Sequence, residues 1–297
     1  NFITANGSME FAAADLATGG DVYTAIASAV PNDAQKRALG NQLNTAAPFV
    51  VNATVDGKAI TAPCSVTLGY KPGDEGSNTL TVVSVGDKGE IASADGRYEG
   101  GVMKCTVPAN TLSAVVRFPF FDVSEGAWYF GEIVYAYNNG LFSGTGDYTF
   151  EPETTMTRGM LVSVLWRLEG KPEAAASPFT DSGDSWYTKA VDWAAANGIV
   201  AGTSATTFEP NATVTREQMA AILFRYANFK KLDTSARADL AGFPDAGSVS
   251  AYATDAMSWA NASGIIVGSN GKLVPQDGAS RAQVAAILHR FIENCIF

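Results

Sequence analysis

The sequence offers few of the residues on which metal sites and enzymes depend. Its 297 residues include one histidine and three cysteines, and no two cysteines form a Cys-x-x-Cys pair. Because structural zinc sites use several Cys or His ligands at close spacing, the chain lacks the donors for one. It also lacks a serine nucleophile elbow, a phosphate-binding loop and a dinucleotide fingerprint. We therefore predict no cofactor and no enzymatic activity, although the many carboxylates of an acidic chain leave a glycosidase open.

Long apolar runs and basic clusters are absent as well. No apolar run approaches the roughly 18 residues that a membrane-spanning helix requires, so we predict no membrane insertion. The N-terminus, NFITANGSMEF, has neither a methionine start nor a signal segment, and we interpret the chain as a trimmed soluble protein or a fragment. The net charge is −10, and no run of Lys or Arg is longer than the pair Lys230-Lys231. A nucleic acid would meet net repulsion, so we predict no such partner.

The three cysteines leave two alternatives open. Cys64 and Cys105 fall in strand-like segments of the first 120 residues. In an oxidising compartment they can form a bridge, and otherwise they are two small buried apolar side chains. Cys295, near the end of the chain, either links chains or lies in the core.

The first 120 residues change texture near Pro48. Before it, the first 45 residues favour helix: in GGDVYTAIASAV (19–30) and PNDAQKRALGNQL (31–43), Pro31 can begin a helix and Ala and Leu recur at helical spacing. After it come short runs rich in Val and Thr, such as FVVNATV, CSVTLGY, TLTVVSV and SAVVRF, separated by turn sequences such as DGK, GDKG and ADG. Short strands at this spacing predict a small antiparallel sandwich or roll.

Beyond Phe121 the sequence repeats itself three times. The segments TFEPETTMTRGMLVSVLWRL (149–168), TFEPNATVTREQMAAILFRY (207–226) and KLVPQDGASRAQVAAILHRF (272–291) share one turn and one helix start. Upstream of each, a Phe-x-Asp or Phe-Asp turn precedes an aromatic-rich helix that stops at a glycine, and a loop with a second glycine follows. The stop glycines are Gly140, Gly198 and Gly264. Repetition of this kind is typical of one supersecondary unit stacked on itself.

The arginine that follows each helix cap is not explained by capping. Thr215 with Gln218 and Ser280 with Gln283 fit a capping box, whereas Thr157 lacks the return partner. A positive charge at a helix start opposes the helix dipole, at a cost of up to about 1 kcal/mol where exposed. A bound anion would bring free amides, dipole and guanidinium together. The alternative is an ion pair with the aspartate of the Phe-x-Asp turn, but we favour the anion because three copies break the same local rule.

This combination of signals resembles the S-layer homology repeat, in three consecutive copies from Phe121 to about Phe291. The resemblance implies an α-helical, pseudo-threefold bundle whose grooves bind a secondary cell-wall polysaccharide, commonly through a pyruvylated amino sugar. It further implies a bacterial, extracellular protein at the cell wall or in the S-layer.

Carried over by position, the resemblance also implies the site residues. The arginines that would pair with the ketal carboxylate are Arg158, Arg216 and Arg281. The aspartates that would brace the arginines or meet sugar hydroxyls are Asp122, Asp181 and Asp245. The loop glycines that would offer backbone amides are Gly144, Gly202 and Gly268. Because copy three has Tyr252 for the first Trp and Leu273 for Phe, and copy one has Gly159 after its arginine, we favour the site around Arg216.

Other recurring residues divide into two groups. Trp128 and Trp186, close to the aspartate turn, are candidates for a platform under a sugar ring. Tyr135, Trp193 and Trp259 share an inward helix face and are predicted to lie in the core. A second set of arginines recurs nine residues after the first, near helix ends where a cation complements the dipole, and we assign it a structural role. Its members are Arg167, Arg225 and Arg290.

The predicted fold class is α+β and multidomain. Residues 1–120 form a helical lead-in plus a β-sandwich-like module, and the repeats span 121–172, 178–230 and 242–297. We predict a non-catalytic protein whose repeats anchor it to an anionic, pyruvylated polysaccharide. The alternative is a self-assembling subunit of a surface layer, tube or filament, in which the repeats and the β module contact copies of the same chain.

Overall fold

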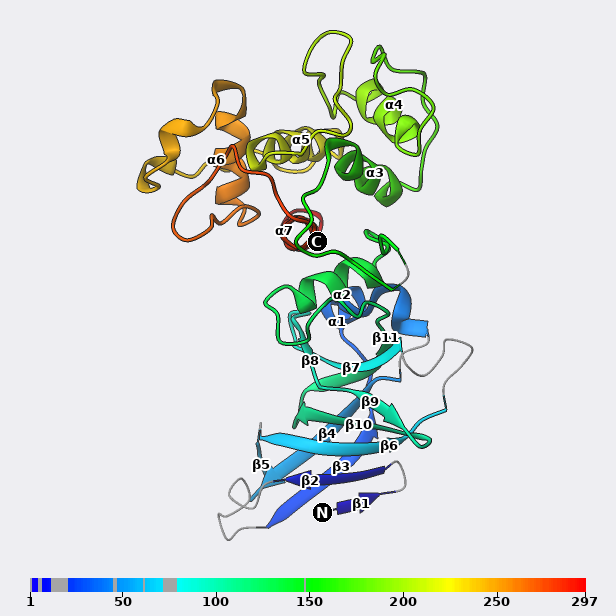
Figure 1. The fold of residues 1–297 in the computed structure, drawn as a ribbon. Coiled ribbons are helices and arrows are strands. Elements are labelled where there is room, and N and C mark those ends of the chain that lie inside the picture. Colours follow the sequence, from blue (N-terminus) through cyan, green and yellow to red (C-terminus); the bar gives the residue numbers. More distant parts are fainter. Residues whose placement is uncertain are drawn as a thin grey trace. The chain divides into compact units, whose positions relative to one another are not determined.

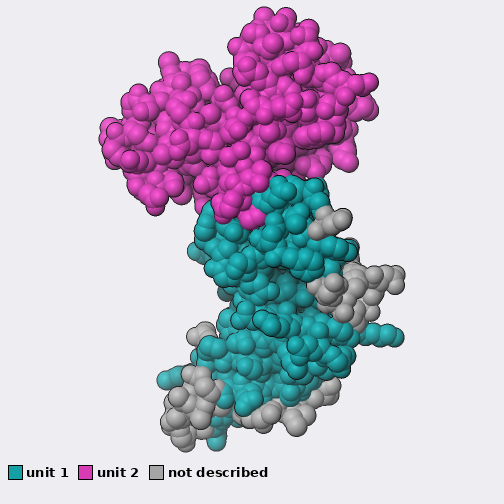
Figure 2. Space-filling view, viewed as in Figure 1, with its two compact units in different colours: residues 1–139, 143–151 teal, residues 140–142, 152–297 magenta. Residues whose placement is uncertain are grey.

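The computed structural model describes residues 2–4, 7–11, 21–44, 47–60, 62–71, 79–146 and 148–297. The chain divides into two compact units (Figure 2), residues 1–139 with 143–151 and residues 140–142 with 152–297. The boundary falls inside the first repeat. The first helix of that repeat therefore belongs to the first unit, and its second helix belongs to the second unit.

Two antiparallel sheets make up most of the first unit (Figure 1). One has the strand order β1-β2-β6-β10-β9, and the other has the order β3-β4-β11-β7-β8 with β5 paired to β4. The strands are β1 (Phe2–Thr4), β2 (Gly7–Phe11), β3 (Val22–Ser28), β4 (Phe49–Val55), β5 (Lys58–Ala59), β6 (Pro63–Gly69), β7 (Leu80–Val85), β8 (Ile91–Ser93), β9 (Arg97–Glu99), β10 (Val102–Pro108) and β11 (Leu112–Arg117). The predicted antiparallel β module is thereby confirmed.

The core of the first unit is built from alternate residues of both sheets. Every second residue of β4 and of β10 is buried. Val51 and Val115 from one sheet belong to the same buried cluster as Val66 and Met103 from the other. Burial of every second residue is what a strand shows when one face is covered and the other is exposed to solvent.

Cys64 and Cys105 lie in this core as free thiols. Strands β6 and β10 pair so that Cys64 stands opposite Val107 and Cys105 opposite Val66. Burial raises the pKa of Cys64 to about 11 and the pKa of Cys105 to about 12. Both thiols are therefore protonated and weakly nucleophilic at neutral pH, which fits the alternative of two small buried side chains.

The helix predicted over the first 45 residues is wrong for β1, β2 and β3; residues 12–20 of this stretch lie outside the described residues. Residues 22–28 form strand β3. The strand pairs along its whole length with β4, from Val22 opposite Val55 to Ser28 opposite Phe49. Its β-branched and aromatic residues fit a pleated surface, and this pairing prevails over the helical spacing of its alanines.

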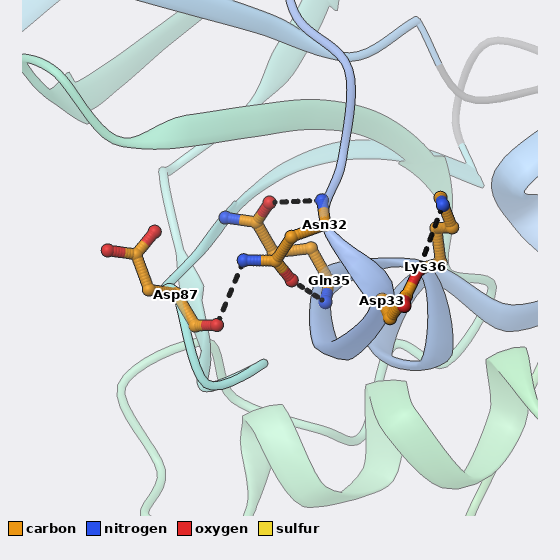
Figure 3. A network of polar contacts seen from close by, with 5 residues as sticks. All are labelled: Asn32, Asp33, Gln35, Lys36 and Asp87. Carbon is orange, nitrogen blue, oxygen red and sulfur yellow. Dashed lines mark hydrogen bonds and ion pairs between the residues drawn. The ribbon is translucent and has the colours of Figure 1, made fainter.

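Helix α1 (Asp33–Leu39) does begin after Pro31 and is fixed to the second sheet (Figure 3). A capping box closes its start, because Asn32 Oδ1 accepts from the amide of Gln35 and Gln35 Oε1 accepts from the amide of Asn32, both at 2.9 Å. Asn32 Nδ2 also donates to the carbonyl of Asp87 at 3.0 Å, in the turn between β7 and β8. The ion pair of Lys36 with Asp33 is exposed and adds little stability.

Helix α2 (Phe130–Asn138), the first helix of repeat one, packs on the same end of the first unit (Figure 1). A β-carbon at Gly131 would collide with the carbonyl oxygen of Ile91 in β8, so only glycine allows this approach. Asn138 and Asn139 donate to the carbonyls of Ala38 and Arg37 at 3.2 and 2.9 Å. The first repeat is thereby tied to the β module through α1.

The second unit is helical. Its α-helices are α3 (Arg158–Leu168), α4 (Thr188–Ala196), α5 (Arg216–Phe229), α6 (Thr254–Ala262) and α7 (Arg281–Phe291). Short 3-10 turns η4 (Leu240–Gly242), η5 (Ala246–Ser248) and η6 (Ala251–Ala253) precede α6, and a π turn, η7 (Ile292–Ile296), follows α7. Helix α3 packs on α4 and α5 packs on α6, so the second helix of one repeat lies against the first helix of the next.

A ring of backbone hydrogen bonds joins the three repeats just before their second helices. The amide of Met156 donates to the carbonyl of Ala279 at 2.9 Å, that of Val214 to Met156 at 2.9 Å, and that of Ala279 to Val214 at 3.4 Å. All three side chains are fully buried. Because each repeat donates to one neighbour and accepts from the other, the ring closes, and the predicted pseudo-threefold arrangement is confirmed.

Candidate functional site

Each aspartate of the Phe-x-Asp turn holds the Phe-x-Pro turn of its own repeat. Asp181 accepts from the amide of Phe208 at 2.8 Å and, with its other oxygen, from the amide of Glu209 at 2.7 Å. Glu209 has a φ of 58°, a left-handed conformation that costs a residue other than glycine roughly 1–2 kcal/mol. The two charge-assisted bonds offset that cost. In the same way Asp122 accepts from the amides of Phe150 and Glu151, and Asp245 accepts from the amides of Leu273 and Val274.

These aspartates are therefore engaged with backbone amides. The amide of Leu273 lowers the pKa of Asp245, desolvation opposes the shift, and the amide of Val274 adds to it. In the part of the chain that the structure describes, neither Arg158 nor Arg216 forms an ion pair with them. The alternative of an arginine–aspartate ion pair thus does not explain these two arginines.

The helix starts are closed by carbonyls of another repeat. The amide of Arg158 donates to Ala212 at 3.0 Å, and that of Gly159 donates to Pro210 at 2.8 Å. The same amide-to-carbonyl bonds recur at the other two helices. At α5 the amides of Arg216 and Glu217 donate to the carbonyls of Asp277 and Pro275. At α7 the amides of Arg281 and Ala282 donate to the carbonyls of Thr154 and Pro152. The third amide of each helix is bonded to the cap side chain of Thr157, Thr215 or Ser280, with full capping boxes at α5 and α7 as predicted. The prediction of free amides that join an anion is wrong, because the neighbouring repeat occupies them.

The guanidinium groups of these arginines lie over the Phe-x-Pro turns. Arg158 is 5% exposed, and its Nε donates to the carbonyl of Phe208 at 2.8 Å while one Nη donates to Ala201 at 3.2 Å. Its guanidinium carbon lies 4.5 Å from the centre of the Phe208 ring. Arg216 repeats this arrangement with a 2.9 Å bond to the carbonyl of Leu273. Burial lowers the pKa of both arginines, and the remaining donor capacity of Arg158 faces the cavity that it lines.

Arg281 is the third member of this set. It is 6% exposed, and its guanidinium carbon lies 5.3 Å from the centre of the Phe142 ring. A buried arginine stacked on an aromatic face is therefore common to the first and third copies.

A cavity of about 410 Å³ lies beside Arg158. Three repeats contribute to its lining. The first repeat supplies Arg158, the second supplies Ala201, Gly202, Thr203, Gln218, Ala221, Ile222 and Arg225, and the third supplies Tyr252. We name this cavity the Arg158 groove. The preference for the site around Arg216 stays a prediction, whereas this cavity gives the Arg158 site a defined shape.

Arg225 is the residue that sequence reasoning placed in a structural role. It is half-buried in the lining and, among the described residues, has no hydrogen-bond or ion-pair partner. Burial lowers the pKa of Arg158, and the nearby charge of Arg225 lowers it further. Its spacing from Arg216 could have revealed this position. Arg225 follows Arg216 by nine residues, or about two and a half helical turns, so it points to the opposite side of the helix, toward the arginine of the preceding repeat.

Tyr252 is held at the other wall by Glu217. This carboxylate is 2% exposed and accepts from the amide and the hydroxyl of Ser250, at 2.9 and 2.8 Å, and from the hydroxyl of Tyr252 at 3.0 Å. Burial and the bond to Glu217 raise the pKa of Tyr252 to about 12. The side chain is therefore a neutral phenol, and the residue is 56% exposed.

The remaining predicted site residues lie at the surface or in tight loops. Trp128 and Trp186 are 63% and 62% exposed and contact a neighbouring tyrosine edge-on. At Gly202 a β-carbon would collide with the carbonyl oxygens of Ser204 and Thr207. Gly144 and Gly268 are crowded by carbonyl oxygens in the same way. The loop glycines are thus required by the path of the backbone. Tyr135, Trp193 and Trp259, at most 2% exposed, are core residues as predicted.

The described residues contain neither a candidate metal site nor a candidate membrane span. No group of three or more His, Cys, Asp or Glu side chains is arranged there to hold a metal ion. None of the helices there combines the length and hydropathy needed to cross a membrane.

Comparison with known proteins gives one family and several relatives. The S-layer homology domain matches residues 119–159, 178–220 and 242–285. The chain is 31% identical over 193 residues to an endoglucanase of Bacillus sp. (strain KSM-635), which covers 63% of this chain and 20% of that protein. It is 32% identical over 160 residues to the surface-layer 125 kDa protein of Lysinibacillus sphaericus, covering 52% of this chain and 13% of that protein. It is 26% identical over 258 residues to exoglucanase XynX of Acetivibrio thermocellus, covering 84% and 23%. The chain spans less than a quarter of the length of these relatives.

Proposed function

The chain is an S-layer homology protein with three such domains, a kind of protein anchored at the cell wall, and on this premise we propose that it binds an anionic wall polysaccharide in the Arg158 groove. Its place at the cell surface follows from the three domains. The ligand group that we propose is a carboxylate carried by a sugar. The sequence resemblance implies one form of it, a pyruvate ketal on an amino sugar.

One observation carries the proposal: two guanidinium groups share one groove, and one of them has no partner among the described residues. Two like charges held close together repel each other, so their proximity carries an electrostatic cost. A carboxylate between them would remove that cost and form charge-assisted hydrogen bonds. The groove is therefore built for an anion rather than for a neutral or cationic group.

The two arginines would play different parts. Arg158 already donates to two carbonyls, so it is held rigidly and supplies a fixed positive charge. Arg225 has its whole planar fork available and would bind the carboxylate through two parallel bonds. Gln218 and Thr203 would meet neighbouring hydroxyl or amide groups, and the exposed ring of Tyr252 would cover one face of the sugar.

The repeats make further sites on the same polymer part of the proposal. Arg216 and Arg281 occupy positions equivalent to Arg158, and α3 and α7 carry Arg167 and Arg290 at the position of Arg225. Several weak sites on one polymer gain from effective concentration, so modest affinity in each groove is enough for firm anchoring. We propose no catalytic role for the chain and no cofactor.

A second function, self-assembly into a surface layer, is favoured by the outer edge of the second sheet. Strand β3 pairs only with β4 among the described strands and exposes Val22 and Tyr23 by 37% and 62%. A long apolar edge strand can pair with another chain. Electron microscopy of the purified protein without glycan tests this: ordered sheets or tubes would support it, and dispersed particles at all concentrations would argue against it.

Calorimetry with a purified wall polymer tests the proposed binding. We expect the native protein to bind the polymer and to lose that binding once the pyruvate ketals are removed by mild acid. The variant Arg225→Gln should bind the intact polymer roughly 10- to 100-fold more weakly, the effect of losing a hydrogen-bonded charge. Arg97→Gln, which removes the same charge from an exposed strand of the first unit, is the matched control and should bind normally. Equal affinity for the two polymers would refute the role of the carboxylate.

A further inference from the structure

The first repeat presents two aromatic side chains to solvent beside Asp122. Phe121 is 68% exposed and Tyr148 is 49% exposed, and their ring centres lie 5.5 Å apart with the ring planes inclined by 46°. The amide of Phe121 donates to the carbonyl of Tyr148 at 3.0 Å, so the backbone holds the two side chains next to each other. Both residues belong to the first unit. We name Phe121 and Tyr148 the aromatic pair.

The path of the backbone does not require aromatic side chains at these two positions. In the second repeat the equivalent residues are Thr180 and Thr206, and the amide of Thr180 donates to the carbonyl of Thr206 at 2.8 Å. In the third repeat the equivalent residues are Pro244 and Gly271. The turn therefore forms with small side chains, and the aromatic pair is a property of the first repeat alone.

Tyr148 adopts a backbone conformation that favours glycine. Its φ is 61°, and the equivalent Gly271 has a φ of 74°. A left-handed conformation is costly for a residue with a β-carbon. Because about half of Tyr148 is exposed, packing in a core does not offset this cost. Backbone strain that the fold does not need is typical of positions that bind a partner.

The surroundings of the aromatic pair are acidic. Between Arg117 and Arg158 the chain contains no lysine, arginine or histidine, and its charged residues there are all aspartate or glutamate. Asp122 follows Phe121 directly, and its carboxylate accepts from the amide of Glu151 at 2.6 Å, so two acidic residues meet at this turn. Carboxylates and the faces of aromatic rings both attract a cation. The charge of the site is therefore complementary to a positively charged group.

Arginine is the cation that this chain already places on aromatic rings. The guanidinium carbon of Arg158 lies 4.5 Å from the ring centre of Phe208, and that of Arg281 lies 5.3 Å from the ring centre of Phe142. Among the described residues, no cation lies over either ring of the aromatic pair. A planar guanidinium stacks on a ring and also donates to a carboxylate, whereas an ammonium is a compact, strongly hydrated point charge.

We propose that the aromatic pair and Asp122 form a docking site for an arginine side chain presented by another protein. The rings would contact the planar face of the guanidinium, and the carboxylate would accept a hydrogen bond from its edge. The site is separate from the Arg158 groove in position and in charge, since it lies in the first unit and takes a cation. The proposal therefore does not depend on the proposed binding of a polysaccharide.

An NMR titration of the whole chain with two peptides tests this docking site. One is a short glycine peptide with blocked ends and one central arginine. The other carries citrulline in its place, which keeps the shape of the arginine side chain but has no charge. We expect the arginine peptide to shift the ring signals of Phe121 and Tyr148 and to bind roughly tenfold more tightly than the citrulline peptide. Equal affinity for the two peptides would overturn the proposal.

Two further observations with the native chain would assign the site to another occupant and overturn the proposal. Glucosamine that binds at the aromatic pair more tightly than the arginine peptide would indicate the ammonium of an amino sugar. Ring signals that shift with protein concentration alone would indicate a second copy of this chain.

Exchanging the aromatic pair for the residues of the second repeat provides the variant. Phe121→Thr combined with Tyr148→Thr should keep the turn, because the second repeat forms it with threonines, and should weaken binding of the arginine peptide roughly tenfold. Tyr23→Thr, which removes an exposed tyrosine from β3 of the same unit, is the matched control and should bind as the native chain does. Undiminished affinity in the double variant, with native thermal unfolding, would refute the assignment. The citrulline comparison uses the native chain, so it decides the question even where the double variant unfolds.

Discussion

Helix α5 carries two arginines that differ in almost every physical respect. Arg216, at its start, is buried, and its Nε donates to the carbonyl of Leu273. Arg225, two and a half turns later, is half-buried and faces the Arg158 groove without a partner among the described residues. Arg216 thus joins one repeat to the next, whereas Arg225 supplies accessible positive charge.

The comparison shows how one repeated helix serves both packing and binding. The first arginines of copies one and two each donate to a turn carbonyl of another repeat, which fixes the walls of the groove. The second arginine can then be held near a like charge, because the frame around it is rigid. A binding group that is poorly satisfied in the free protein is what a pre-organised site requires.

Replacing each arginine by alanine should produce the largest contrast, in stability. Arg216→Ala leaves the carbonyl of Leu273 without its donor and opens a void, so we expect a loss of about 2–4 kcal/mol in the free energy of unfolding of the second unit. Arg225→Ala should change it by about 0.5 kcal/mol or less, since no bond is lost. Scanning calorimetry of the whole chain measures both. Similar losses of unfolding free energy in the two variants would show that the two arginines do not differ in their contribution to stability.

Lysine in place of Arg225 should sharpen the contrast in binding. Arg225→Lys keeps the charge but loses the planar fork, so we expect affinity for the pyruvylated polymer to fall about fivefold, against 10- to 100-fold for Arg225→Gln. Titration calorimetry at two salt concentrations measures the effect. If lysine and glutamine weakened binding equally, geometry rather than charge would dominate the contact.

Local signals in the sequence predicted much of the second unit. The stop glycines Gly140, Gly198 and Gly264 have φ values of 66°, 66° and 69°, as left-handed helix ends require. The capping boxes of α5 and α7 are present where the Thr/Ser and Gln spacing predicted them. These features depend on residues within one turn of each other, which is why local spacing in the sequence predicted them.

Contacts between repeats could not be predicted in the same way. The helix-start amides are bonded to carbonyls such as that of Ala212, and a backbone carbonyl has no sequence signature. The helix predicted before Pro31 failed for a related reason, since pairing of β3 with β4 decides its conformation. The part played by Arg225 follows only once the threefold ring places α5 beside the arginine of the preceding repeat.

Removing the hydroxyl of Tyr252 should have a smaller effect on binding. In Tyr252→Phe, Glu217 keeps its two bonds from Ser250, so the fold should hold while the ring loses its anchor. We expect about threefold weaker binding of the polymer, because the ring is then held less firmly beside the sugar. Because the pKa of Tyr252 is raised to about 12, native binding should show no loss from tyrosinate formation between pH 8 and 10. A decline in that range that disappears in Tyr252→Phe would contradict the neutral phenol.

The aspartate that braces the turn under Arg216 should give the smallest dependence on pH, confined to acid. The amides of Leu273 and Val274 keep the pKa of Asp245 below its usual value, so its contribution to stability is present above the unfolded pKa of about 3.9 and is lost as the pH falls through the lower folded pKa. The melting temperature of the native chain should therefore fall more steeply below about pH 4 than that of Asp245→Asn, whose amide does not titrate. Above pH 5 the two slopes should be parallel. Identical slopes in acid would mean that this carboxylate does not brace the turn that Arg216 contacts. The structural role that distinguishes Arg216 from Arg225 would then lose part of its support.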